Sequence, residues 1–151
     1  MFPKRLTQAM RSDAMLLIAL SAVVTLVLDL VAKSAIELRG AAPGLRVGSL
    51  LQLRHVASRK RSYALAPFRF LLVTIWTSAF VAAVLLTATG VISSRIAQVA
   101  MGAALGGAAG NLFDILKSRS VRDYIDLGWW PVFNLADVAI LGGLAVALLH
   151  R

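Results

Sequence analysis

The chain has 151 residues, of which 59% are hydrophobic and 15% charged, and its mean hydropathy is +0.80. This composition is too apolar for a soluble domain and predicts a single integral membrane domain over residues 1–151. The lack of cysteine excludes disulfides, thiol nucleophiles and cysteine metal sites. The formal net charge of +9 fits lipid head groups better than nucleic acid in so apolar a chain, so we expect no nucleic-acid partner.

Four apolar windows are long enough to cross a hydrocarbon layer about 30 Å thick as helices of about 20 residues. They cover residues 15–32, 70–92, 96–113 and 132–149. The first window follows basic residues, as in a signal peptide, but it is longer than the usual apolar core of one and lacks a clear cleavage site. The predicted fold class is therefore an all-α membrane protein with four transmembrane helices.

The segment 34–69, between the first two windows, is too polar to cross a membrane. Its glycines and proline, followed by partial alternation over residues 47–56, predict a small β-like element at the membrane surface. The cluster Arg59, Lys60 and Arg61 comes next. These cations could face solvent and phospholipid, or they could contact a lipid substrate.

The third window carries Gly102, Gly106 and Gly110 at four-residue steps, a spacing that favours close packing of helices in membranes. Asn111 and Asp114 follow on one helix face, near the end of that window. Four spans would bring the ends of the first and third, and the start of the fourth, to the membrane face opposite both termini. The polar residues expected to meet there are Asp29, Lys33, Asn111, Asp114, Asp123, Asn134 and Asp137.

Four of the seven acidic residues, including Asp126, lie between residues 110 and 139. Carboxylates are costly in apolar sequence, about 2.5 to 3.5 kcal/mol at a bilayer centre, so their concentration indicates a site. Two carboxylates close together hold one proton between them, and such a pair can hydrolyse an amide as acid and base without His, Cys or metal. His55 and His150 are far apart, which argues against a His-based site. Proton or cation transport and a purely structural network remain alternatives at this point.

Three C-terminal segments, residues 110–114, 121–126 and 131–140, resemble the signature of the lipoprotein signal peptidases, or signal peptidase II. The family pattern reads approximately G-N-x-x-D-R, then V-x-D-F/Y, then F-N-x-A-D. Asp29 and Lys33 resemble the family's D-Q-x-[ST]-K at the end of its first helix. The resemblance implies an intramembrane aspartic endopeptidase that releases signal peptides from diacylglyceryl-modified prolipoproteins and needs no cofactor and no metal.

By motif position, the resemblance places the catalytic aspartates at Asp123 and Asp137. It assigns support and substrate binding to a polar shell formed by Asn111, Asp114, Asn134, Asp29 and Lys33. Asp126 matches no position of the motif, and we expect it to be a solvated loop carboxylate.

The chain also departs from the family pattern. Ile115 stands where the family has Arg after G-N-x-x-D, and Lys117 or Arg119 could replace that charge, though not its geometry. Leu30 replaces the usual Gln, and residues 58–63 lack the Asn and Gly of the family's surface segment. The alternative function is therefore a non-catalytic or substrate-shifted paralogue that binds lipoproteins or lipid head groups.

The resemblance implies a multi-pass protein of the bacterial inner (cytoplasmic) membrane, with cytoplasmic termini and a site toward the outer leaflet. The distribution of Lys and Arg argues for the reverse orientation, because segments 34–69 and 117–122 carry more of them than the termini. We follow the resemblance. Expected partners are lipidated prolipoproteins and membrane phospholipid; the oligomeric state is open, with a monomer as the expectation.

Overall fold

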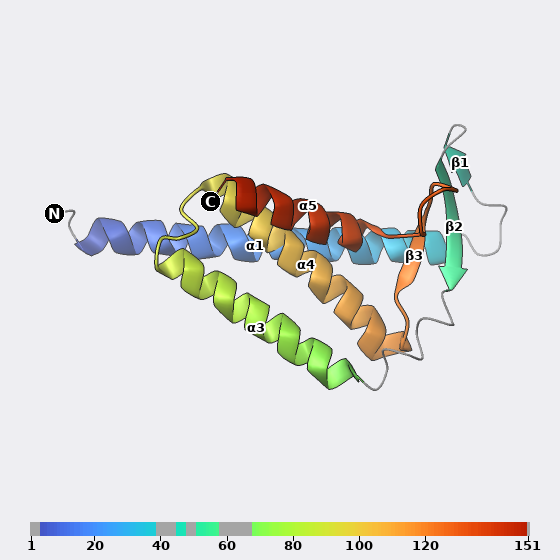
Figure 1. Cartoon of the computed structure of the whole chain (residues 1–151), viewed down its shortest axis with the longest axis horizontal. Coiled ribbons are helices and arrows are strands. Elements are labelled where there is room, and N and C mark those ends of the chain that lie inside the picture. Colours follow the sequence, from blue (N-terminus) through green and yellow to red (C-terminus); the bar gives the residue numbers. More distant parts are fainter. Residues whose placement is uncertain (1–3, 39–44, 48–50, 58–67, 151) are drawn as a thin grey trace.

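The computed structural model describes residues 4–38, 45–47, 51–57 and 68–150. Within these residues the helices are α1 (Lys4–Leu38), α3 (Arg69–Ala88), α4 (Arg95–Ser118) and α5 (Leu135–Leu149), and the strands are β1 (Leu45–Val47), β2 (Leu51–Ala57) and β3 (Arg122–Asp126). The basic cluster Arg59, Lys60 and Arg61, and most of the divergent stretch 58–63, lie outside the described residues. The mostly helical architecture confirms the predicted fold class (Figure 1).

Among the described residues, three helical stretches are long and apolar enough to cross a membrane, namely Ser12–Leu38, Phe70–Ala88 and Arg95–Ser118. The fourth expected span is the apolar helix α5, which has 15 residues. Half of the most apolar window of α4 is buried, against 17% for α1 and 11% for α3. Helix α4 is therefore the central helix, and the other two direct most of their apolar side chains outward.

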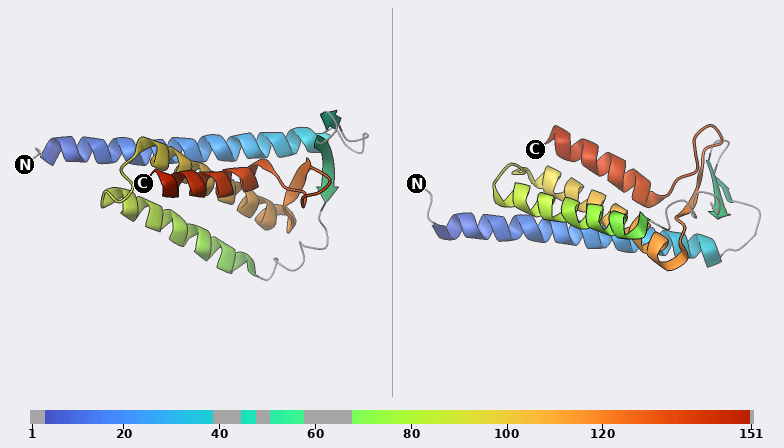
Figure 2. Two further views of the ribbon diagram at one scale, coloured as in Figure 1. Left: turned by 45° about the horizontal axis from the view of Figure 1, so that its top comes forward. Right: turned by 60° about the horizontal axis from the view of Figure 1, so that its bottom comes forward.

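Helix α4 packs against both α1 and α5 through small residues (Figure 2). A Cβ atom added to Gly106 would overlap the carbonyl oxygen of Ala22 in α1. A Cβ atom on Gly107 would lie 2.6 Å from the carbonyl oxygen of Ala136 in α5. The glycine-rich faces of α4 thus allow the backbones to approach closely, as the spacing predicted.

Some helices begin or end at residues other than the bounds of the apolar windows, because polar residues extend or cap them. Helix α1 continues to Leu38 and α4 to Ser118, so Lys33 and Asp114 are helical although they lie beyond the windows. Helix α5 begins only at Leu135, three residues after the window, because Asn134 caps it. The side chain of Asn134 accepts from the Asp137 N–H, and the side chain of Asp137 accepts from the Asn134 N–H, which is a capping box.

The strands form an antiparallel sheet in the order β1-β2-β3, at the end of the bundle away from both termini (Figure 1). Strands β1 and β2 confirm the expected surface element. Strand β3 corrects the expectation of a plain loop after α4, since Arg122 pairs with Ala57 and Asp126 with Gln52. The expectation that Asp126 is solvated was also wrong: Asp126 is buried and accepts a 2.8 Å hydrogen bond from the Gly128 N–H.

Candidate active site

The seven polar residues expected to converge do so at the sheet end of the bundle. Helix α1 supplies Asp29 and Lys33, α4 supplies Asn111 and Asp114, β3 supplies Asp123, and the start of α5 carries Asn134 and Asp137. Hydrogen bonds and ion pairs join all seven into one connected network. Segments more than 100 residues apart in sequence therefore meet in one polar cluster, as in the contact of Ala136 with Asp29.

Lys33 is the cation at the centre of the buried part of this network, and its exposure is 1%. Its Nζ lies 2.6 Å from Asp29 Oδ2 and 3.0 Å from Asp114 Oδ2, and it donates to Asn111 Oδ1 at 3.0 Å. Three oxygens thus lie within 3.0 Å of the ammonium nitrogen, two of them from carboxylates, which compensates for the burial of its charge. Asp29 also accepts a hydrogen bond from the backbone N–H of Ala136 at 3.1 Å, so the Asp29–Lys33 pair of α1 holds the start of α5.

Asn134 links the two candidate catalytic carboxylates and is fully buried. Its Nδ2 donates to Asp123 Oδ1 at 3.0 Å and to Asn111 Oδ1 at 3.0 Å, while its backbone N–H donates to Asp137 Oδ2 at 3.1 Å. Asn111 Nδ2 donates to the other oxygen of Asp137 at 2.8 Å. Each oxygen of the Asp137 carboxylate therefore accepts a hydrogen bond, and the group has a fixed orientation.

Arg122, which the sequence analysis did not single out, is the second cation of the network. Its Nε and Nη2 donate to Asp114 Oδ1 at 3.0 and 2.6 Å, and its Nη1 donates to Glu37 Oε2 at 2.9 Å. Burial by itself lowers the pKa of Arg122, but the hydrogen bonds and charges of Asp114 and Glu37 outweigh burial and raise it. Lys117 and Arg119, the expected replacements for the missing family Arg, are both exposed.

Tyr124 is a further buried residue that the sequence analysis had not given a role. Its hydroxyl oxygen accepts from the Leu135 N–H at 3.3 Å, and burial raises its pKa above the ordinary value of 10.0. The backbone N–H groups of Tyr124 and Ile125 both donate to the carbonyl oxygen of Phe133, at 3.1 and 2.8 Å. These bonds attach the strand that carries Asp123 to the chain that leads into α5.

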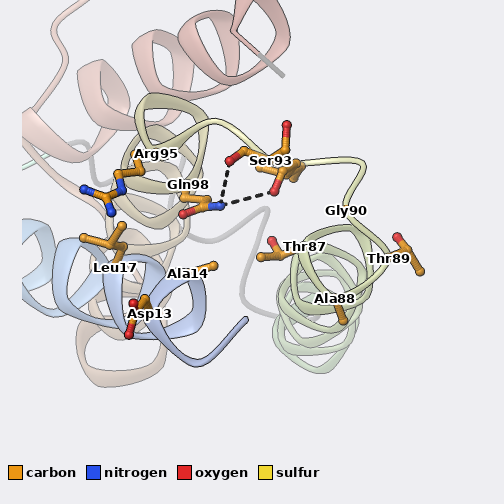
Figure 3. Close-up of a pocket in the computed structure, with 11 residues that line it drawn as sticks. Asp13, Ala14, Leu17, Thr87, Ala88, Thr89, Gly90, Ser93, Arg95 and Gln98 are labelled. Carbon is orange, nitrogen blue, oxygen red and sulfur yellow. Dashed lines mark hydrogen bonds between the residues drawn. The ribbon is translucent and has the colours of Figure 1, made fainter. Parts of the chain in front are cut away.

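A cavity of about 280 Å³ lies at the opposite end of the bundle, beside the turn between α3 and α4 (Figure 3). Thr87, Gln98 and Arg95 line it, and Asp13 is its one acidic residue among those the structure describes there. Gln98 Nε2 donates to the carbonyl oxygens of Ile92 and Ser93 at 3.3 Å each, which ties the turn to α4. This cavity offers no carboxylate pair from the described residues, whereas Asp123 and Asp137 lie in the polar network at the other end.

The model of the family described as Signal peptidase (SPase) II matches residues 21–151 of this chain. The chain belongs to the signal peptidase II family. It is similar to the lipoprotein signal peptidase of Syntrophomonas wolfei, with 38% identity over 66% of this chain and 67% of the relative. It is also similar to the lipoprotein signal peptidase of Halothermothrix orenii, with 31% identity over 69% of this chain and 72% of the relative.

Two solved structures share the fold of this family member. Both carry the description "Bacterial membrane enzyme structure by the in meso method", one at 2.3 Å and the other at 1.9 Å resolution. Each superposes with a TM-score of 0.72 at 21% identity over 91% of this chain, covering 86% and 91% of the respective solved chains. The protein is therefore a multi-pass membrane protein of a peptidase family.

Proposed function

We propose that the chain is an aspartic endopeptidase that releases signal peptides from diacylglyceryl-modified prolipoproteins, with Asp123 and Asp137 as its catalytic pair. The observation that carries the proposal is the position of Asn134, whose side chain binds Asp123 while its backbone binds Asp137. Names of the relatives support the same activity, since they are lipoprotein signal peptidases. Asn111, Asp114, Asp29 and Lys33 would hold the pair and line the substrate site.

In the proposed reaction, one carboxylate takes a proton from water as the water oxygen attacks the scissile carbonyl carbon. The other carboxyl group, which holds a proton, donates it to the carbonyl oxygen, so a neutral tetrahedral diol forms. When the diol collapses, the carbon–nitrogen bond breaks and the first group returns its proton to the leaving amine. A hydroxyl of the diol returns the other proton, which restores the pair without a cofactor.

The lipid on the substrate would hold the scissile bond at the membrane interface, which raises its effective concentration at the site. Exposed Trp129 and Trp130 lie between β3 and α5, and indole rings favour the interface of a membrane. They support placing the carboxylates near head groups, with phospholipid as a partner. The proposal also takes the chain to act as a monomer. We propose the bacterial inner membrane, cytoplasmic termini and a site facing the outer leaflet.

Orientation has a direct test because the chain has no native cysteine. A single cysteine in place of Gly128 should react with an impermeant maleimide added outside intact cells, whereas one in place of His150 should react only after lysis. The reverse labelling pattern would refute the proposed orientation.

Activity is tested by incubating the purified protein in lipid vesicles with a lipidated prolipoprotein. Mass spectrometry should show cleavage before the diacylglyceryl-modified cysteine, and the precursor without lipid should be cut far more slowly. A cut elsewhere, or equal rates with and without lipid, would refute the proposed specificity.

The second candidate is a non-catalytic paralogue that binds lipoproteins or lipid head groups. The buried Ile115, at the position where the family pattern has Arg, favours it. The two candidate functions can be distinguished by expressing the chain in a bacterial strain that lacks its own lipoprotein signal peptidase. Restored processing by the wild-type chain, and none with Asp123→Asn at equal membrane levels, would support the enzyme; no restoration, with lipoproteins from the native source also tried, would support the paralogue.

A further inference from the structure

Arg122 joins three parts of the fold at the residue that directly precedes Asp123. Its guanidinium group bonds Asp114 in α4 through Nε and Nη2, and Glu37 in α1 through Nη1. Its backbone N–H donates to Asp114 Oδ2 at 3.2 Å, and its carbonyl oxygen accepts from Asn134 Nδ2 at 3.4 Å. The side chain and the backbone of Arg122 are therefore both held by residues of other elements.

The hydrogen bonds of the Arg122 guanidinium group restrict the position of that side chain. A guanidinium group presents its donors in a rigid planar fork, and two of them converge here on one carboxylate oxygen while a third reaches another helix. The guanidinium side chain is 17% exposed, and the Asp114 side chain is 1% exposed, so solvent weakens their pairing little. Asp114 is itself held by Lys33 at 3.0 Å, which links this anchor to α1.

The pairing of β3 with β2 is disturbed near Arg122 and Asp123. Strand β3 contains five residues and pairs with β2 in a register that is irregular between Leu53 and Val56. Asp123 lies opposite Val56, directly beside that irregularity. A short strand with a disturbed ladder fixes the direction of a side chain less firmly, so the anchor at Arg122 adds to the hydrogen bond from Asn134 Nδ2 in setting where the Asp123 carboxylate points.

We infer that Arg122 is a positioning residue for Asp123. From its place in β3, it supplies the positive charge that the family pattern has in the helix, at the position of Ile115. The inference rests on the proposed function, because it concerns the geometry of the proposed catalytic pair. Arg122 acts through the backbone it fixes and through Asp114. Loss of its side chain therefore lowers turnover without weakening substrate binding.

Steady-state cleavage of a lipidated prolipoprotein by Arg122→Ala tests this role. We expect kcat to fall by about tenfold or more and KM to change by less than about threefold, since small misplacement of a catalytic group slows chemistry strongly. Arg122→Lys keeps the charge but loses the fork, so it should show a smaller loss of kcat, and it remains available if the alanine variant does not fold. Lys117→Ala, which removes an exposed cation one turn away from Asp114, is the matched control and should keep wild-type kcat.

Hydrogen exchange provides a second readout that does not require cleavage. The Tyr124 and Ile125 amides, which donate to Phe133, should exchange at least about tenfold faster in Arg122→Ala than in Lys117→Ala. Unchanged kcat, an increase of KM alone, or unchanged exchange would each overturn the positioning role. If the wild-type protein does not cleave while a control enzyme does, the proposed function fails, and the exchange rates alone then decide the role of Arg122.

Discussion

Replacing Gly110 by Ala tests how tightly α4 approaches the buried ion pair of α1. A Cβ atom at this position would lie 2.5 Å from Asp29 Oδ2 and 3.3 Å from its Cγ. Real Cβ contacts are longer than 3.0 Å, so the carboxylate would have to retreat by about 0.5 Å or more from a position only 2.6 Å from Lys33 Nζ. We expect overpacking to cost about 1 to 3 kcal/mol, beyond any gain in helix propensity.

Gly142→Ala is the matched control for this measurement. A Cβ atom on Gly142, in α5, would meet nothing within 4 Å, so the variant gains helix propensity without a clash. Thermal unfolding in one detergent should place Gly110→Ala below Gly142→Ala by several degrees, and cleavage should fall in Gly110→Ala alone. Equal melting temperatures would refute the close approach of Gly110 to Asp29.

Two further predictions concern the connections around the carboxylates. Asn134→Ser keeps a helix cap but removes the buried amide donor to Asp123 and Asn111, so cleavage should fall by about tenfold or more and the melting temperature should also fall; activity equal to wild type would contradict the role of the amide. The raised pKa of Tyr124 means that the folded protein keeps the neutral phenol, whereas the unfolded chain ionises near pH 10. Stability from this source is present below that pH and is lost as pH rises through the folded pKa, so the melting temperature of the wild type should fall relative to that of Tyr124→Phe as pH rises above 10.0; a constant difference would contradict the assignment.

Much of the architecture follows from the sequence because apolar length and small-residue spacing have few solutions in a membrane. The convergence of Asp29, Asn111 and Asp137 could be predicted from the number of spans alone. The exact ends of the helices could not be predicted from the sequence. Lys33 and Asp114 extend their helices because each pairs with a charged residue of the other helix. Those partners are visible only in the folded bundle.

Other features depended on contacts that the sequence does not encode locally. Lys117, Arg119 and Arg122 lie within six residues, and no local signal tells which of them reaches Asp114. The choice falls on Arg122 because its guanidinium group and its backbone N–H both reach the Asp114 carboxylate, whereas Lys117 and Arg119 are exposed. Strand β3 itself, and with it the burial of Asp126, depends on pairing with β2, a strand that lies far away in the sequence.

The central claim is that Asp123 and Asp137 act as one catalytic unit. Its most direct test is the turnover number of Asp123→Asn, Asp137→Asn and the double variant, each shown to be folded in lipid, on a lipidated prolipoprotein. Residues that act as a unit have non-additive effects, so each single variant should lose about a thousandfold or more in kcat and the double variant should lose no more than either. Wild-type turnover in either folded single variant would contradict the claim.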